Sequence, residues 1–332
     1  MKEMVMTKRK ITIFLDAARY LGRDISEEEI SRIKDIFKGE LIIAKNAEEL
    51  MKKGLDSEVL VASAIESPPV EYYKQNKNLK WVHTLMAGFD GLMPREFDDK
   101  IVMTNTRGIH GAFISEHVLA LILTFARQMK RSILNQAKHV YVAKNVGFTQ
   151  VRNSTALIIG FGLIGKETGK LLKAVGMHVE AVKHNTEPNE EAQAIAERFY
   201  SLDELEEGLA NADYVILITP LNENTRGMIG EKQIGCMKRT GVLINVGRGA
   251  VVDEDALVCA LNSHMIGGAA LDATVEKPIP PDSKLWDAEN IIITPHCAAG
   301  MPDYLKLSLE LFCQELERYA ANEPLKNIVR NA

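Results

Sequence analysis

The chain has 332 residues, of which 46% are hydrophobic and 26% charged, and its formal net charge at pH 7 is −5. This length suits two domains of ordinary size, and the composition is that of a globular protein. An acidic balance without a basic block argues against a nucleic-acid partner, and no apolar segment reaches the roughly 20 residues needed to span a membrane.

The cysteines indicate a reducing compartment. No secretory signal peptide is visible, and the four cysteines are scattered without a C-x-x-C pair. Such spacing is typical of free thiols rather than of a disulfide framework or a zinc site. We therefore expect a cytoplasmic protein without a metal site.

Residues 10–105 alternate strand and helix patterns, which predicts a parallel sheet covered on both faces. The expected strands are 11–15, 41–44, 58–62, 81–84 and 101–105, and the expected helices are 26–37, 47–53 and 70–75. After the fourth strand, the backbone N–H groups of Ala87 and Gly88 could hold a carboxylate. Taken alone, this segment is more simply interpreted as a turn.

A long helix is expected over residues 115–135, because apolar positions recur there at helical spacing. It is predicted to carry the chain from a first domain to a second. His117 near its start is interpreted as a packed or capping histidine rather than a catalytic one.

Residues 155–176 carry the most informative pattern, a buried strand, a glycine-rich turn and a helix. The turn is the G-x-G-x-x-G of dinucleotide-binding folds, where the glycines allow a tight turn, a close pyrophosphate and close packing of helix on strand. The helix N-terminus offers free N–H groups to the phosphates. The residues expected to bind the cofactor here are Gly160, Gly162, Leu163, Ile164 and Gly165.

The next strand ends in Lys183 and His184, where an NAD-binding fold usually has an acidic residue on the ribose. An acid would repel a 2′-phosphate, whereas Lys183 would attract it. We therefore predict that NADP(H) is preferred, with NAD(H) possible. In the alternative interpretation Lys183 is a solvated lysine, and Glu180 or Asn185 contacts the ribose.

Three later segments place polar residues at the ends of expected strands, which is where ligands bind in such sheets. Pro220 and Thr225 follow one strand, Val246 and Arg248 the next, and His296 the last. The first three are expected to lie against the cofactor, and the guanidinium of Arg248 matches a carboxylate. Singly, Arg248 could be a surface ion-pair partner and His296 a core histidine. The further strands of this part are expected at 213–219, 242–246, 266–271 and 291–294, with helices at 190–198, 202–209, 232–238 and 254–262. An amphipathic helix over 304–321 is expected to return and pack on the first domain.

The pieces GFGLIG, TPLNENTRGMI, LINVGRGAVVDEDAL, GGAALDAT, PPDSKLW and ITPHCAAG, in this order, resemble the D-isomer-specific 2-hydroxyacid dehydrogenases. HTLMAGFD and NTRGIHGAFISEHVLALIL fit the same family, so the resemblance covers nearly the whole chain, and the glyoxylate/hydroxypyruvate reductase branch is the most similar. It implies an α/β protein of two doubly wound parallel-sheet domains with a cleft between them. Residues 109–300 would form the Rossmann dinucleotide-binding domain, and residues 1–108 plus 301–332 a flavodoxin-like substrate domain. A homodimer is also implied.

The same resemblance implies roles for single residues. Arg248 would hold the substrate carboxylate and polarise the 2-oxo group, with the Ala87 and Gly88 amides sharing the carboxylate. His296 would donate a proton to the carbonyl oxygen, a task that suits a pKa near neutrality. Asp272 would contact the nicotinamide carboxamide.

The chain departs from the family pattern beside this histidine. The family usually has a glutamate just before the proline of the loop, whereas here Lys277 occupies that place and Glu276 precedes it. A carboxylate would raise the pKa of His296, and an ammonium would lower it. Three interpretations are open: the loop shifts so that Glu276 serves, which we favour; Lys277 binds an acidic substrate tail; or catalysis is impaired.

The predicted function is an NAD(P)-dependent 2-hydroxyacid dehydrogenase that acts as a reductase of small 2-oxo acids. One alternative is a non-catalytic dinucleotide sensor similar to the C-terminal-binding co-repressors, which only Lys277 favours. Another is a phosphoglycerate-type dehydrogenase, whose substrate phosphate would require basic residues by the cleft.

Overall fold

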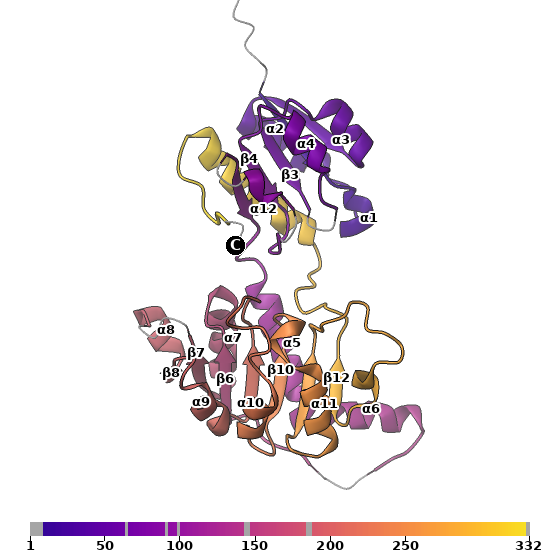
Figure 1. Ribbon diagram of the computed structural model, residues 1–332, viewed down its shortest axis with the longest axis vertical. Coiled ribbons are helices and arrows are strands. Elements are labelled where there is room, and N and C mark those ends of the chain that lie inside the picture. The colour runs from indigo at the N-terminus through magenta and orange to yellow at the C-terminus, as the bar shows by residue number, and fades with distance from the viewer. Residues whose placement is uncertain are drawn as a thin grey trace, which may run out of the picture. The chain divides into compact units, whose positions relative to one another are not determined.

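The computed structural model describes residues 9–63, 66–89, 92–97, 100–142, 147–183 and 188–329. The chain divides into two compact units, Met1–Ile109 with Met301–Ala332 and His110–Gly300 (Figure 1). Each unit is an α/β domain built on one parallel sheet, which confirms the predicted fold class. Within the described ranges, no helix combines the length and apolar character that a membrane crossing requires.

The first unit has a five-stranded parallel sheet in the order β2-β1-β3-β4-β5, the order of flavodoxin-like sheets. Its strands and the helices between them match the predicted ones within a few residues. The elements are β1 Lys10–Phe14, α1 Ala17–Leu21, α2 Glu27–Phe37, β2 Glu40–Ala44, α3 Ala47–Lys53, β3 Val59–Ala62, α4 Val70–Gln75, β4 Trp81–Thr84, η1 Arg95–Phe97, β5 Val102–Asn105 and α12 Tyr304–Ala320.

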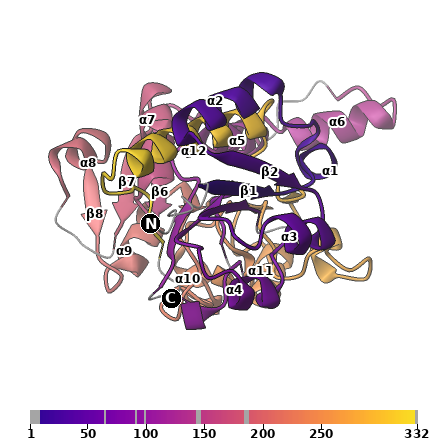
Figure 2. The same cartoon turned by 90° about the horizontal axis from the view of Figure 1, so that it is seen from above.

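Helix α12 comes from the far end of the chain and lies beside α2 on one face of this sheet, while α3 and α4 lie on the other (Figure 2). Its residues Leu305, Leu309, Phe312 and Leu316 recur at helical spacing and are buried. The Phe312 ring packs against Trp81 of β4, with 5.5 Å between ring centroids. The predicted return of this helix to the first domain is therefore confirmed.

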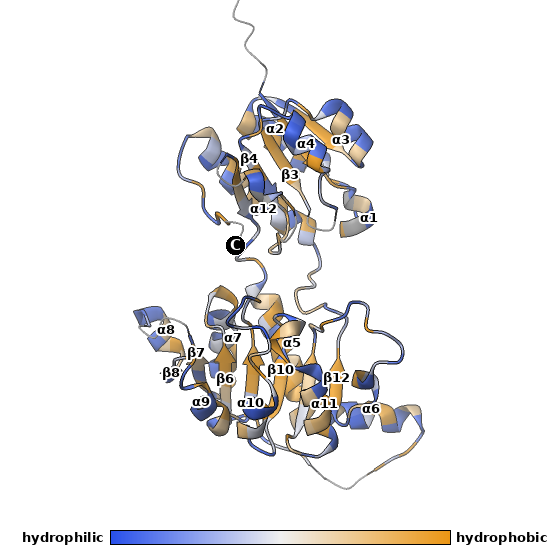
Figure 3. Ribbon diagram, in the orientation of Figure 1, coloured by the Kyte–Doolittle hydropathy of each residue, from blue (hydrophilic) through white to orange (hydrophobic). Residues whose placement is uncertain are grey.

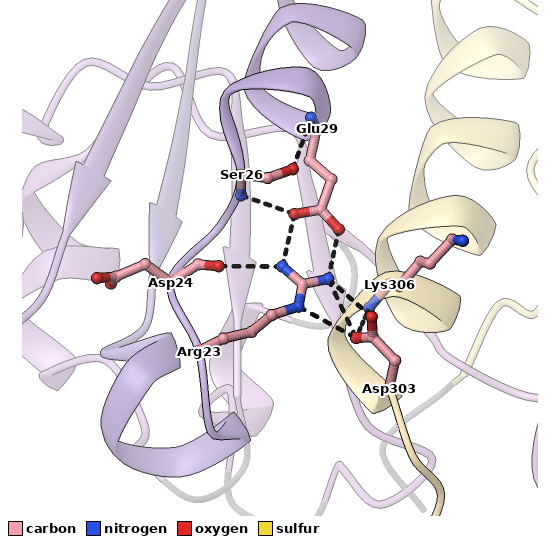
Figure 4. A network of polar contacts seen from close by, with 6 residues as sticks. All are labelled: Arg23, Asp24, Ser26, Glu29, Asp303 and Lys306. Carbon is pink, nitrogen blue, oxygen red and sulfur yellow. Dashed lines mark hydrogen bonds and ion pairs between the residues drawn. The ribbon is translucent and has the colours of Figure 1, made fainter.

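A charged cluster joins the N-termini of α2 and α12 (Figure 4). The Arg23 guanidinium donates to both carboxylate oxygens of Glu29, at 2.9 and 2.7 Å, and to Asp303 at 3.1 Å. Glu29 also accepts from the Ser26 backbone, which completes a capping box, and Asp303 caps α12 through the Lys306 amide. Hydrogen bonding from Arg23 lowers the pKa of Glu29.

The second unit has a seven-stranded parallel sheet in the order β12-β11-β10-β9-β6-β7-β8. The chain enters at β6, runs outward to β8, and returns to β9 beside β6, which is the Rossmann strand order with one strand added. Its central strands are largely apolar (Figure 3) because both faces are covered, whereas β7 and β8 towards one edge also carry charged side chains. The elements are α5 Gly111–Ala126, α6 Met129–Ala137, β6 Thr155–Ile159, α7 Leu163–Ala174, β7 His178–Val182, α8 Glu190–Ile195, β8 Arg198–Tyr200, α9 Leu205–Asn211, β9 Tyr214–Leu217, α10 Glu231–Cys236, β10 Val242–Asn245, η2 Gly249–Val251, α11 Glu254–Asn262, β11 Gly268–Leu271, η3 Lys284–Asp287 and β12 Ile291–Ile293.

Two predicted helices of this unit were wrong in extent. The single helix expected over 115–135 is divided into α5 and α6, because Gln128 has a φ of 53° that an α-helix cannot continue through. The helix expected over 190–198 ends at Ile195, since Arg198–Tyr200 pairs with β7 as an extra strand. Tyr200 is fully buried there, so tertiary packing overrides the local helical pattern.

Candidate active site

The glycine-rich turn between β6 and α7 has the geometry that a dinucleotide pyrophosphate needs. Gly160 has a φ of 102°, and a Cβ at Gly165 would lie 2.2 Å from the Gly160 carbonyl oxygen. A Cβ at Gly162 would meet nothing within 4 Å, so the backbone is open to a ligand there. No side chain caps α7 at Gly162, which leaves its first N–H groups available. Gly160 and Gly165 thus allow the tight turn and the close packing predicted for them, and the contact of Gly162 with a pyrophosphate stays a prediction.

The residues expected to flank the cofactor have different surroundings. Leu163 is 60% exposed at the start of α7, and Ile164 packs on the core. Lys183 is partly buried directly after β7, whereas Glu180 accepts a hydrogen bond from the Tyr200 hydroxyl at 2.9 Å. His184 and Asn185 lie outside the described residues.

The loop after β9 is closed by its own hydrogen bonds. The buried Thr225 hydroxyl donates to the Pro220 carbonyl at 2.7 Å and accepts from the Asn222 amide at 2.8 Å. The hydroxyl is thus engaged in shaping the loop, and Thr225 holds Pro220 in place at the strand end. Their contact with the cofactor stays a prediction.

Arg248 is held at the end of β10 by a residue that the sequence analysis missed. Asn245 is fully buried, donates to the Arg248 carbonyl at 3.0 Å and accepts from the Gly247 amide at 3.0 Å. Val246 between them is buried in the core of this unit, and its predicted contact with the cofactor stays a prediction. A buried asparagine at a strand end was the available sequence signal, because such a residue must find backbone partners.

The Arg248 side chain itself is exposed. It donates to the Gly247 carbonyl at 3.0 Å, and within the described ranges no carboxylate forms an ion pair with it. The interpretation of Arg248 as a surface ion-pair partner is therefore not supported. Its guanidinium is available for the carboxylate of a ligand.

His296 follows β12 in a loop whose shape depends on Asp272. The Asp272 carboxylate, 4% exposed, accepts from the Thr294 hydroxyl at 2.6 Å and from the Cys297 and Ala298 amides at 2.8 and 3.0 Å. These bonds clamp the backbone on both sides of His296, whose φ is 55°. Asp272 thus has a structural role here, and its predicted contact with a nicotinamide carboxamide stays a prediction.

His117 on α5 hydrogen-bonds to the Thr294 hydroxyl at 3.2 Å and lies 3.8 Å from Asp272, which agrees with its interpretation as a packed histidine. The side chains of His117, Asp272 and Cys297 bring three potential metal-ligand atoms within 4.8 Å of one another. Both Asp272 oxygens are already engaged, so we assign no metal to them.

The partner of His296 differs from the favoured expectation. Lys277 lies with its Nζ 2.9 Å from His296 Nδ1, so the loop does not shift to bring Glu276 there. Glu276 is exposed, and the pKa of Glu254 is raised mainly by burial and further by the charge of Glu276. The loop packs closely against Gly249, where a Cβ would lie 2.0 Å from the Thr274 carbonyl carbon.

The charges around this pair are mainly positive. Partial burial lowers the pKa of His296, and Lys277 and Arg248 lower it further, while Asp272 opposes them. Partial burial and Arg248 also lower the pKa of Lys277, again against Asp272. Arg248 and Lys277 thus place two cationic side chains beside His296, which would attract an anionic substrate.

Ala87 and Gly88 belong to the first unit and follow β4. The Ala87 carbonyl accepts a hydrogen bond from the Asn105 side chain at 2.6 Å. Among the described residues, neither of the two amide N–H groups has an acceptor, and a Cβ at Gly88 would meet nothing within 4 Å. These amides are open to a ligand, as a carboxylate-binding turn requires.

Known proteins of one family resemble the chain in sequence and in fold. The model of the D-isomer specific 2-hydroxyacid dehydrogenase NAD binding domain matches residues 119–298. A glyoxylate reductase of Korarchaeum cryptofilum is 29% identical over 93% of this chain and 95% of its own length. A D-3-phosphoglycerate dehydrogenase of Methanocaldococcus jannaschii is 27% identical over 92% of this chain and 58% of its own length. The solved structure of a D-isomer specific 2-hydroxyacid dehydrogenase family protein from Aeromonas salmonicida gives a TM-score of 0.82 at 24% identity, over 97% of this chain and 99% of that one.

Proposed function

Because the chain belongs to the D-isomer-specific 2-hydroxyacid dehydrogenase family, and is thus an oxidoreductase acting on CH–OH groups with NAD(P) as acceptor, we propose that it reduces small 2-oxo acids. The expected substrates are those of the glyoxylate/hydroxypyruvate reductase branch, to which the relative from Korarchaeum cryptofilum also points. We further propose that NADPH is preferred over NADH, and that the protein acts as a cytoplasmic homodimer.

The observation that carries this proposal is Arg248, which forms no ion pair among the described residues and lies close enough to His296 for its charge to lower the pKa of that ring. The Arg248 guanidinium would hold the substrate carboxylate through two parallel hydrogen bonds and polarise the adjacent carbonyl. The Ala87 and Gly88 amides would share that carboxylate. His296 Nδ1 is bonded to Lys277, so Nε2 is the nitrogen that would give a proton to the carbonyl oxygen.

The glycine turn supports the binding of a dinucleotide by the second unit. The open backbone at Gly162 and the uncapped start of α7 would receive the pyrophosphate. When bound, the nicotinamide supplies the hydride for the carbonyl carbon. Lys183 at the end of β7 would meet a 2′-phosphate, and this supports the preference for NADPH.

Steady-state reduction of glyoxylate, hydroxypyruvate, pyruvate and phenylpyruvate, each with NADPH and with NADH, tests the proposal. We expect turnover with at least one of the first two substrates, and a higher kcat/KM with NADPH. Tight NADPH binding without turnover of any of the four would contradict it. Static light scattering of the same sample tests the homodimer.

Phosphoglycerate chemistry is a second candidate, favoured by the similarity to the Methanocaldococcus jannaschii enzyme. Its reverse substrate, phosphohydroxypyruvate, belongs in the same panel. A kcat/KM for phosphohydroxypyruvate above those of the four unphosphorylated acids would favour this candidate.

A further inference from the structure

We propose that Lys277 supplies the proton that His296 delivers to the substrate, so that the two side chains form a lysine–histidine relay in place of the carboxylate–histidine pair of the family. This inference rests on the function proposed above. Lys277 would act through His296, and only His296 would be a catalytic residue.

The direction of the hydrogen bond between the two side chains is the starting point. An ammonium group donates and cannot accept, so Lys277 Nζ donates to His296 Nδ1 across 2.9 Å. Nδ1 must therefore be unprotonated, and the ring proton of neutral His296 lies on Nε2. A carboxylate partner would reverse this arrangement, because it would accept from a protonated Nδ1.

Both ends of this hydrogen bond are on anchored loops. Asp272 holds the amides on the C-terminal side of His296, and the His296 amide donates to the Thr294 carbonyl at 2.9 Å. On the lysine side, the Val275 amide donates to Glu254 at 2.7 Å. The contact is thus built by two independent sets of hydrogen bonds, rather than by the chance position of a long side chain.

The proposed step balances in atoms and electrons. As the substrate carbonyl carbon accepts a hydride, its C=O π bond breaks and the oxygen takes the proton from His296 Nε2. Nδ1 takes a proton from the Lys277 ammonium, which becomes a neutral amine, while His296 returns to a neutral ring with its proton on the other nitrogen. The lysine ammonium is thus the acid consumed in the reduction. The starting state returns when Nε2 takes a proton from water and Nδ1 gives its proton back to the Lys277 amine.

This arrangement answers the two remaining interpretations of Lys277. The Lys277 ammonium contacts Nδ1 of His296, whereas the substrate would contact Nε2. Lys277 is therefore poorly placed to bind a substrate tail. Lys277 also does not disable His296 in this proposal. The ring donates its proton as a neutral imidazole rather than as an imidazolium, and the Lys277 ammonium supplies the proton that Nδ1 takes up. The charged groups that face the pair are Arg248 and Asp272, which act on both members with opposite signs. His117 and Cys297 lie against Asp272.

The relay predicts the pH above which kcat/KM for reduction falls. In the wild type, kcat/KM should hold through neutral pH and fall only as pH rises through the pKa of Lys277, which lies below its usual value. In Lys277→Met, the donor must be the His296 imidazolium, so kcat/KM should already fall as pH passes the histidine range. Ordinary lysine and histidine pKa values differ by about 4 units, so a downward shift of about 2 units or more is expected.

Lys277→Arg separates hydrogen bonding from proton transfer. A guanidinium can donate to Nδ1, but it does not lose its proton in proteins. We expect kcat to fall at least about tenfold with KM changed less than about twofold, since only the acid is lost. Lys284→Met, at a lysine whose side chain is 81% exposed, is the matched control and should leave the profile unchanged.

A second readout needs no turnover. Nitrogen-15 NMR of the histidine rings in cofactor-free protein, with His296→Gln for assignment, should show neutral His296 protonated on Nε2 in the wild type and on Nδ1 in Lys277→Glu. The relay would be overturned if kcat/KM fell at the same alkaline pH in the wild type and in Lys277→Met. It would also be overturned if the neutral His296 ring of the wild type were protonated on Nδ1. A wild type without turnover would instead refute the proposed function, and the NMR result would still decide whether Lys277 controls the tautomer.

Discussion

At the scale of single residues, the proposed preference for NADPH depends on Lys183. It is partly buried at the end of β7, where an acidic residue would contact the ribose of NAD. Glu180, the described acidic residue of that strand, is bonded to the Tyr200 hydroxyl. An ammonium in this position would donate a charge-assisted hydrogen bond to a 2′-phosphate. Its hydrogen bond to a ribose hydroxyl would be weaker, because that acceptor is uncharged.

Lys183→Ala should therefore lower kcat/KM with NADPH about tenfold or more, because hydrogen bonds to charged groups contribute about 1.5–3 kcal/mol. With NADH the value should stay within about twofold. Lys232→Ala, at an exposed lysine of the same unit, is the control. Equal losses with both cofactors would assign Lys183 a structural role.

At the scale of elements, the packing of α7 on β6 decides whether the cofactor can bind. A Cβ at Gly165 would lie 2.2 Å from the Gly160 carbonyl oxygen, closer than any non-bonded pair tolerates. Gly165→Ala should push the start of α7 away from the turn, and we expect NADPH binding, measured by fluorescence titration, to weaken at least about tenfold. An unchanged Kd would show that α7 can move without loss of the site.

Gly235→Ala is the matched control for this substitution. Gly235 is also helical, lies in α10, and a Cβ there would meet nothing within 4 Å. Alanine in a helix is about 0.5–1 kcal/mol more favourable than glycine. The control should therefore bind NADPH as the wild type does, with an equal or higher midpoint of thermal unfolding.

At the scale of the whole molecule, the first unit is assembled from both ends of the chain. The Arg23 cluster joins the start of α2 to the start of α12, while the apolar stripe of α12 covers Trp81. Arg23→Met should lower the free energy of unfolding of this unit by about 1–2 kcal/mol, since it removes charged hydrogen bonds that are partly exposed. Arg32→Met, which loses only an exposed 4.0 Å pair with Glu317 between the same helices, should change it by less than about 0.5 kcal/mol.

The effect of Arg23→Met should also depend on pH. The folded-state pKa of Glu29 is lowered, so the stability it contributes is present above its unfolded pKa of about 4.3 and is lost as pH falls through the folded value. The difference between Arg23→Met and the wild type should thus be largest at neutral pH and shrink in acid. Urea unfolding at pH 7 and at pH 4 measures it. A difference that does not change with pH would show that Arg23 stabilises by packing alone.

The sequence by itself determined the features that depend on local chemistry. Apolar runs of strand length and the capping box at Ser26 are local signals, so the strands and most helices were predicted within a few residues. The glycine turn was predictable because Gly160, Gly162 and Gly165 each meet a requirement of backbone geometry that few other residues can meet.

Only the tertiary structure decided the features that depend on contacts between distant residues. The extra strand β8 exists because β7 pairs with it, and Asn245 is important because two turns of the sheet edge bond to it. Lys277 rather than Glu276 meets His296 in a loop that packs closely against Gly249, where a Cβ would lie 2.0 Å from the Thr274 carbonyl carbon. A shift of one residue changes no local propensity, so the sequence left both residues open, and the packing of one loop against another selected the lysine.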